Sequence, residues 1–507
     1  MSAPLVVGVD VGSQGTCAQA LELDGTLVAA SYAPHELAYP RPGWAEQDCD
    51  EWLQALVSTL RGVREACAGR EIAALSFGSQ LDGLVAARAD GSVLRPALIW
   101  CDRRADAECD EVAARVGARE LHALTGCNLD PSHVAPKIAW LAHNEPDVAT
   151  AAAAFLLPGS WMAWRASGVL AVDPSNASST GLLDPRSRAW SAEACDAYGV
   201  DPERLAPVVA AHAPLGPIAP WLGEATGLKP DTLVVMGCGD EMAATLGAGV
   251  VEPGVVCDVL GTAEPVCAVV ATPAHDPTGV TELHPHADPD TWLLENPGWL
   301  SGGAYRWFRD EFGGPESAQA AATGADVYDL LNALAEEVPP GADGVLWVPA
   351  LAGAMAPEWN PRARAAWFGL TAAHGRAHLA RALVEGNAMA LRDVIEAIAG
   401  AGADAPREVV CVGGGARGRL LLQVRASVTG LPVTRPEDVE TTARGAAMLA
   451  AAGAGLYPSV AAAARAMAGP REETVEPDPS ERAVYDALHG HYRRLYTALR
   501  PLFDAAA

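Results

Sequence analysis

The segment Leu5-Val-Val-Gly-Val-Asp-Val-Gly-Ser-Gln-Gly-Thr16 decides the fold class of this chain. Its apolar half predicts a β-strand that ends in the acid Asp10, and Gly12 and Gly15 then frame a tight turn. An apolar stretch returns from the turn, and a third apolar run, Thr26 to Ala30, follows an Asp-Gly turn. The segment therefore predicts an antiparallel meander of three strands with an acid and a glycine turn at one end.

A similar unit recurs in the second half of the chain. The apolar run Thr232 to Met236 predicts a strand that ends in Gly237-Cys-Gly-Asp240. Val255 to Leu260 predicts another strand, which turns at Gly261-Thr262 into the apolar run Glu264 to Val270. The pattern predicts an internal duplication of two sheet-based halves, each offering a glycine hairpin.

A third glycine element lies further along the chain. Glu408 to Val412 predicts a strand, Gly413-Gly-Gly415 a loop, and Arg417 to Thr429 a helix that ends at Gly430. A strand, a glycine loop and a helix start together favour an anion or nucleotide platform.

Strand and helix patterns alternate along the rest of the chain. Asp50 to Cys67 predicts a helix, and Ile72 to Phe77 and Leu94 to Trp100 predict strands. This alternation indicates α/β layering. The Pro-containing run Gly216 to Pro230 is the expected domain junction.

The charge balance excludes several functions. The 507 residues contain 35 Lys and Arg against 63 Asp and Glu, a net charge of -28, so the surface repels nucleic-acid backbones. Only two of the basic residues are lysines, Lys137 and Lys229, and no Walker A run, protein-kinase glycine loop with its lysine, or GxSxG elbow occurs. If this protein handles phosphate, we therefore expect it to do so with backbone amides, a metal or arginine.

The remaining composition points to a folded intracellular chain. No stretch of about 18 apolar residues is free of breaks, so we expect no membrane span. The cysteines form no CxxC pair and the first residues lack a signal pattern, so we expect free thiols and a cytoplasmic location. His284 and His286 have no evident third metal ligand, and we expect both at the surface.

Two strand-end acids are candidates for chemistry. Asp10 could hold a metal-bound water, and the turn after it could wrap phosphate oxygens, although ordinary hairpins share this pattern. Asp240 could accept a proton from an attacking hydroxyl. It could equally cap the helix predicted over Glu241 to Leu246.

Polar residues also follow the predicted strand at Ile72 to Phe77. Gln80 and Asp82 alternate with Leu81 at a place where open α/β sheets bind ligands, and their groups suit a hydroxyl-rich ligand. A plain polar turn is equally consistent with this segment. Trp100 offers a ring for the C–H face of a sugar, close to Asp102 and two arginines that could pair with that acid.

The order of these motifs resembles the FGGY family of carbohydrate kinases, most closely its xylulokinase branch. The resemblance runs from about Leu5 to about Gly455, nearly the whole chain. The stretches that carry it are Val9 to Thr16, Pro42 to Asp48, Trp100 to Arg103, Ala135 to Leu141, Gly237 to Asp240, Leu260 to Thr262, Ala365 to Glu385, Gly413 to Ala416 and Gly445 to Ala447.

The resemblance implies an α/β fold of two actin-like, ribonuclease-H-like domains with the active site in the interdomain cleft. We expect residues 1-228 to form the sugar-binding domain and residues 229-507 the nucleotide-binding domain. By resemblance, Asp240 is the general base and Asp10 faces Mg²⁺. The residues implied for ATP are Gly12, Ser13, Gln14, Gly15, Thr16, Gly261, Thr262, Gly413, Gly414 and Gly415. Those implied for the sugar are Gln80, Leu81, Asp82, Trp100, Asp102 and Glu241.

Two residues depart from the pattern of xylulokinases. Asp82 stands where these enzymes usually carry histidine, and an ionised carboxylate can only accept hydrogen bonds from hydroxyls. Glu241 follows the expected base where Asn or Gln is common. Glycerol kinases carry a carboxylate near the position of Asp82, so this residue favours a polyol substrate over D-xylulose itself.

The predicted reaction is transfer of the ATP γ-phosphoryl group to a terminal hydroxyl of a pentulose or related polyol. Two alternatives remain open: an actin-fold ATPase or phosphatase without a sugar substrate, and a non-catalytic sugar-sensing pseudokinase. We expect a small-molecule sugar or polyol as partner, no nucleic acid and no membrane, with a homodimer as a possibility.

Overall fold

The first half of the chain is built on a mixed β-sheet. The computed structural model describes residues 3–402 and 404–505. The predicted meander is confirmed as β1 (Leu5–Val11), β2 (Gly15–Leu21) and β3 (Leu27–Pro34), which pair antiparallel. The strand β5 (Ile72–Ser79) lies parallel to β1, and the sheet continues through β12 (Leu233–Val235) and β11 (Pro214–Pro217) in the order β11-β12-β5-β1-β2-β3.

The second half repeats this plan. The strands β14 (Val255–Val259), β15 (Val266–Val270) and β17 (Trp292–Asn296) form an antiparallel meander, and β14 lies parallel to β20 (Glu408–Val412). The full order is β16-β17-β15-β14-β20-β21-β22, with β16 (Glu282–Pro285) and β22 (Arg471–Val475) at the edges and β21 (Val433–Pro436) inside β22. The core strand order and senses of the two sheets are the same, so the predicted duplication is confirmed.

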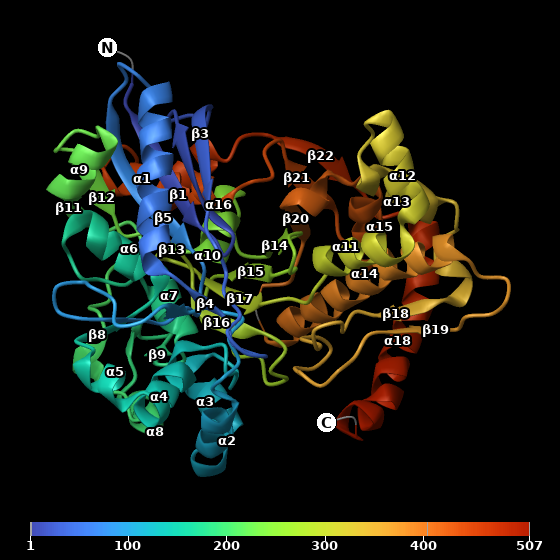
Figure 1. Cartoon of the computed structure of the whole chain (residues 1–507). Coiled ribbons are helices and arrows are strands. Elements are labelled where there is room, and N and C mark those ends of the chain that lie inside the picture. Colours follow the sequence, from blue (N-terminus) through green and yellow to red (C-terminus); the bar gives the residue numbers. More distant parts are fainter. Residues whose placement is uncertain (1–2, 403, 506–507) are drawn as a thin grey trace.

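Some helices lie between the two sheets, and others cover the outer faces of the sheets. The helix α16 (Thr442–Gly453) packs on β1 and β5 of the first sheet and on α10 (Asp240–Gly247). The helix α1 (Cys49–Ala66), predicted within one residue at each end, covers β2 and β3. The helices α14 (Arg376–Gly400) and α15 (Arg419–Thr429) belong to the second lobe, which Figure 1 shows beside the first.

Each sheet carries additional elements. Between β5 and β12 the chain forms β6 (Val85–Ala87), α2 (Asp106–Arg115), α3 (Ala118–Thr125), α4 (Val134–Asn144), α5 (Pro146–Ala151), β8 (Ala154–Leu156), α6 (Pro158–Ser167), α7 (Pro174–Ser179), β9 (Leu183–Asp184), β10 (Ala189–Trp190), α8 (Ala192–Tyr198) and α9 (Pro220–Thr226). The second half adds α11 (Gly302–Phe312), α12 (Gly314–Thr323), α13 (Val327–Glu336), β18 (Leu346–Val348), β19 (Ala366–Phe368), α17 (Val460–Met467) and α18 (Pro479–Ala505).

One predicted strand is wrong in extent. Only β7 (Ala97–Leu98) forms within the run Leu94 to Trp100, and it pairs with β4 (Glu46–Gln47). Pro96 has no N–H for a strand ladder, which limits pairing on its N-terminal side.

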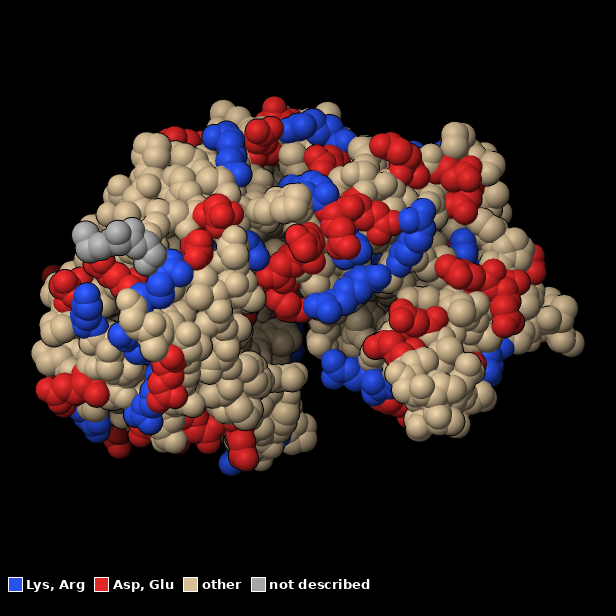
Figure 2. All heavy atoms as spheres, turned by 90° about the horizontal axis from the view of Figure 1, so that it is seen from above, with Lys and Arg blue, Asp and Glu red and all other residues tan. Residues whose placement is uncertain are grey.

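The domain boundary at 228/229 stays a prediction. Because β12 and β13 (Cys238–Gly239) both pair with β5 of the first sheet, we propose that the boundary lies later, between α10 and β14. Figure 2 shows acidic and basic side chains intermixed over one face, with a hollow between the lobes at its lower edge. Within the described ranges, none of the helices combines the length and the apolar character that a membrane crossing requires.

Candidate active site

Asp10 and Asp240 leave the first sheet at the same edge. The strands β1 and β13 flank β5, and Asp10 and Cys238 both lie opposite Gly78. Two interstrand spacings therefore separate Asp10 from Cys238, roughly 10 Å. Asp240 follows two residues later, so the structure brings together the two acids that the sequence singled out.

The environment of these acids favours their protonated forms. Burial raises the pKa of Asp10 to about 8, and the negative charges of Asp240 and Glu440 add to the shift. Burial also raises the pKa of Asp240 to about 7, with a further contribution from Asp82. A group with a pKa near neutrality can both accept and release a proton, as a general base must.

Asp240 is the first residue of α10 and not its cap. The N-cap is Gly239, and Asp240 Oδ1 accepts the Glu241 N–H at 3.1 Å. The alternative interpretation of Asp240 as an N-cap is therefore wrong. The position at the helix start nevertheless places its charge where backbone N–H groups favour an anion.

The first glycine hairpin is held from two sides. Gly12 N–H donates to Gly15 O at 3.1 Å, and Tyr32 lies so close to Gly15 that a Cβ there would stand 2.3 Å from the Tyr32 hydroxyl oxygen. Trp100 Nε1 donates to Ser13 Oγ at 2.8 Å. Ser13 is half-buried and Gln14, whose carbonyl accepts from the Tyr32 hydroxyl, is exposed.

Thr16 differs from the rest of the predicted phosphate turn. Its side chain is fully buried, and Thr16 Oγ1 has no hydrogen-bond partner in the described structure. Its hydroxyl lies inside the lobe, so the turn offers mainly backbone amides and Ser13 to a phosphate.

Gln80 supports the hairpin from behind. Its Nε2 donates to Gln47 Oε1 at 2.8 Å, and Gln47 in turn donates to Ser13 O at 2.7 Å. Leu81 packs against Gly239, where a Cβ would lie 2.4 Å from Leu81 Cδ2. Gly239 therefore lets this side chain approach the backbone next to the expected base.

Asp82 is fixed by two residues that the sequence did not assign to the site. Its backbone is left-handed, with φ 57°, and its carbonyl accepts from Lys137 Nζ at 2.7 Å. The fully buried Lys137 also donates to Ile99 O, at 2.8 Å, and to Ser132 O. His133 Nδ1 lies 3.1 Å from Asp82 Oδ1. The sequence does single out Lys137 in one respect, because it is one of only two lysines in the chain.

Trp100 and Asp102 lie in different environments. Trp100 is 45% exposed, as expected of a ring that contacts a ligand. Asp102 is fully buried, and its oxygens accept from the Ala45 N–H at 2.6 Å and from the Arg104 guanidinium. This placement is at odds with the predicted substrate contact, because the oxygens are already occupied, so we assign Asp102 a structural role.

A cavity lies in the C-terminal lobe. It has a volume of about 480 Å³, and its lining includes four predicted glycine-loop residues, Gly261, Thr262, Gly414 and Gly415. Gly413 is not among the lining residues; it has φ 81°, and a Cβ there would stand 2.9 Å from Leu260 O. Lining residues that the motifs did not indicate include Tyr305, Asn332, Asn387 and Arg417.

His284 and His286 are buried, at 2% and 3% exposure, so their predicted surface position is wrong. Both belong to the segment around β16, which packs against α7 of the first lobe. Short sequence patterns do not record this packing, because the partner lies about a hundred residues away.

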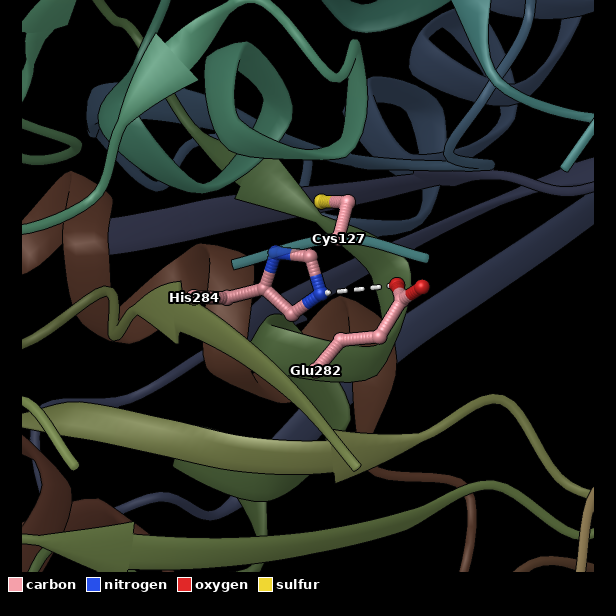
Figure 3. A group of neighbouring side chains, drawn as sticks. All are labelled: Cys127, Glu282 and His284. Carbon is pink, nitrogen blue, oxygen red and sulfur yellow. Dashed lines mark ion pairs between the residues drawn. The ribbon is translucent and has the colours of Figure 1, made fainter. Parts of the chain in front are cut away.

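His284 belongs to a buried cluster with Cys127 and Glu282. Figure 3 shows its imidazole turned toward Glu282, and ligand atoms of the three residues lie within 4.8 Å of one another. Each of the three side chains already has a protein partner. Cys127 donates to Ser178 O at 3.2 Å, and His284 Nδ1 lies 2.7 Å from Ser178 Oγ. Glu282 accepts the Asn128 N–H at 2.6 Å. We therefore interpret the cluster as an internal ion network and not as a metal site.

Two duplicated lobes with strand-end acids and glycine loops are typical of phosphate-handling proteins of the actin-like fold. Family models agree: the N-terminal domain of the FGGY family of carbohydrate kinases matches residues 5–247, and its C-terminal domain matches residues 258–454. The chain belongs to the FGGY family of carbohydrate kinases.

Relatives with different substrates are similar over nearly the whole chain. The autoinducer-2 kinase of Escherichia coli (strain K12) is 32% identical, with 98% of this chain and 95% of the relative covered. The gluconokinase of Bacillus subtilis (strain 168) is 28% identical, with 89% and 87% covered. The crystal structure of xylulose kinase from Rhodospirillum rubrum superposes with a TM-score of 0.89 at 28% identity, with 99% and 100% covered. Family membership favours the carbohydrate kinase over the two alternative functions.

Proposed function

We propose that this kinase phosphorylates a terminal hydroxyl of an uncharged pentulose or related polyol, with Asp240 as the general base. The observation that carries the proposal is that Asp240 follows β13 at the same edge of the first sheet as Asp10, close enough to Asp10 and Asp82 for their charges to interact. In this arrangement Asp82 and Trp100 bind the sugar, and Asp240 accepts the proton of the attacked hydroxyl.

The charges around the cleft favour a neutral substrate. Asp82 and Asp240 contribute negative charge, while the nearby cations are engaged: Lys137 by three carbonyl groups and His133 by Asp82 and Glu282. The carboxylate of a sugar acid would face these acids, and neither Lys137 nor His133 would be free to pair with it. Hydroxyls, in contrast, can donate to the carboxylates. We therefore favour a polyol or ketose over gluconate.

Asp10 is the residue we propose to hold Mg²⁺. Asp10 offers a carboxylate, which can bind Mg²⁺ directly or accept hydrogen bonds from its bound waters. The neighbouring acids Asp240 and Glu440 make a cation favourable there. When bound, the ion would neutralise phosphate charge. We place the nucleotide base and ribose in the cavity of the second lobe and the phosphates between Gly12–Thr16 and Gly261-Thr262. The homodimer remains a prediction.

The test is ADP release with a panel of xylulose, ribulose, glycerol, pentitols and gluconate. We expect turnover with at least one uncharged pentulose or polyol and little with gluconate. The variant Asp240→Asn should lower kcat by about 10²–10⁴-fold while nucleotide affinity is kept. Near wild-type turnover in this variant, or gluconate as the best substrate, would contradict the proposal.

A further inference from the structure

His133 reaches Asp82, the proposed sugar ligand, from a neighbouring helix. It is the N-cap residue of α4 and is buried, and its Nδ1 lies 3.1 Å from Asp82 Oδ1. One turn further along α4, Lys137 Nζ donates to the backbone carbonyl of Asp82 at 2.7 Å. Residues four positions apart lie on one face of a helix, so the start of α4 holds both the backbone and the carboxyl group of Asp82.

The other side of the His133 imidazole faces the second lobe. Its Nε2 lies 3.5 Å from Oε1 of Glu282, a buried residue of β16 in the second sheet. This contact is an ion pair and not a hydrogen bond. The Asn128 N–H donates to the same Glu282 oxygen at 2.6 Å and fixes its position. Both ring nitrogens therefore face carboxylates, an arrangement that favours the doubly protonated imidazolium.

This arrangement leaves one oxygen of Asp82 for a ligand. The Asp82 side chain is 18% exposed, and while His133 engages Oδ1, Oδ2 has no hydrogen-bond partner among the described residues. Burial lowers the pKa of His133, but the charges of Asp82 and Glu282 outweigh it and raise the pKa well above its usual value. The charged imidazole has no acceptor, and both of its N–H groups face protein carboxylates. The ligand therefore meets an ionised carboxylate that accepts hydrogen bonds.

We propose that His133 is a positioning residue of the sugar site, which holds Asp82 by Oδ1 and leaves Oδ2 to accept a hydrogen bond from a sugar hydroxyl. This inference rests on the proposed function, in which Asp82 binds the sugar. The subsite offers the substrate an acceptor and no donor, so it selects a hydroxyl over a carbonyl at this position. Because Glu282 comes from the second sheet, the second lobe completes a sugar subsite that belongs to the first.

Two amide variants separate the roles of the two ring nitrogens. The Asn amide nitrogen replaces Nδ1, because both atoms are bonded to Cγ, whereas the Gln amide nitrogen reaches toward the position of Nε2. For the uncharged panel substrate with the highest kcat/KM, we expect His133→Gln to raise KM about 10–100-fold, the effect of losing one hydrogen bond to a charged group. His133→Asn keeps a neutral hydrogen bond about half as strong, so KM should rise only about 3–10-fold.

In both variants kcat should fall less than KM rises, because the lost contact binds the substrate and does not move the proton. A buried residue that only stabilised the fold would not produce this ranking of the two amides. An unchanged KM in His133→Gln, or a larger rise in His133→Asn than in His133→Gln, would overturn the proposal.

A double-variant cycle tests whether His133 acts through Asp82. Asp82→Asn has no carboxylate to hold, so adding His133→Gln to it should raise KM less than about threefold. The matched control is His143→Gln on the same helix, where Nδ1 lies 3.3 Å from Glu108 Oε1 but the histidine side chain is 56% exposed. This control should leave KM unchanged. A full His133→Gln effect in the Asp82→Asn background would overturn the proposal.

Calorimetry with the same substrate measures the ranking without turnover, and melting temperatures show whether each variant folds. If His133→Gln does not fold, His133→Asn and its cycle with Asp82→Asn carry the test, and a rise in KM that persists in that double variant would overturn the proposal. If Asp240→Asn retains turnover while the ranking holds, the proposed base is wrong and the role of His133 stands. If Asp240→Asn is inactive and the ranking fails, only the inference about His133 is wrong.

Discussion

Gly445 lies so close to Ala243 that a Cβ at position 445 would stand 1.9 Å from the Ala243 carbonyl oxygen. The two residues belong to α16 and α10, the helices that pack between the sheets. Gly8 of β1 shows the same closeness to α16, with 1.7 Å to Ala443 O. The lobes are therefore joined by backbone contacts that tolerate no side chain, directly behind the base on α10.

We expect Gly445→Ala to destabilise the protein. The added methyl group meets a backbone carbonyl, which cannot move aside like a flexible side chain, so the cost should be at least about 1–3 kcal/mol. Thermal unfolding measures it. The control is Gly490→Ala in α18, where a Cβ meets nothing within 4 Å and should stabilise by about 0.5–1 kcal/mol. Equal melting temperatures for the two variants would contradict the close packing.

Turnover should fall on acidification through about pH 7. The pKa of Asp240 is raised to about 7 by burial and by Asp82, and only the ionised form accepts a proton. In Asp82→Asn the charge that raises this pKa is gone. The acidic limb of the pH profile of kcat/KM should therefore move to lower pH, even though sugar affinity falls. The position of the limb is measured from kcat/KM as a function of pH for each variant, with the exposed Glu252→Gln as control. A limb that stays in place or moves to higher pH would show that Asp82 does not act on the base.

We expect Arg425→Met to lower the free energy of unfolding strongly. Arg425 is 1% exposed and pairs with the fully buried Asp258 at 2.8 Å and Glu264 at 2.7 Å, so its removal leaves two buried carboxyl groups uncompensated. The loss should be about 3–5 kcal/mol in urea unfolding.

The matched control for that variant is Arg407→Met. Arg407 pairs with Glu252 at 3.0 Å, but both side chains are more than half exposed. Solvent screens such a pair, so the change should stay within about 1 kcal/mol. Similar losses for the buried and the exposed arginine would argue against the burial of the first.

Asn387→Leu should weaken nucleotide binding. Asn387 lines the cavity of the second lobe, is 4% exposed, and its Oδ1 has no partner in the described structure, so it is free to accept a hydrogen bond from a nucleotide. The loss of one such bond should lower ADP affinity about 3–10-fold, measured by calorimetry. Exposed Gln319→Leu on α12 is the control, and unchanged affinity in both would place the nucleotide elsewhere.

Much of the fold could be predicted because its signals are local. The meander, the helix α1 and the glycine loop before α15 each follow from apolar periodicity and turn residues within about ten neighbours. Asp10 and Asp240 were found for the same reason, since each stands at the end of a strand. Gly430 ends α15 in a left-handed conformation, with φ 73°, as its position predicted.

The errors concern residues whose partners are distant in the chain. For Asp102 the sequence offered both a sugar contact and pairing with a nearby arginine; the structure has the pairing, with Arg104, and adds the distant Ala45 N–H, which no local pattern indicates. His284 resembled a surface histidine, but Ser178 and Glu295 surround it. No pattern over a few residues encodes such contacts.

The sequence by itself determined the duplicated α/β plan, the glycine loops and the two strand-end acids, because strand length, turns and charge are properties of adjacent residues. Only the tertiary structure decided which polar groups face the cleft and which are buried against a partner. It also raised the pKa of Asp10 to about 8, because burial and the charges of Asp240 and Glu440, the latter far along the chain, favour the protonated form. A carboxyl group's chemistry depends on its surroundings, and those are created only when the two lobes meet.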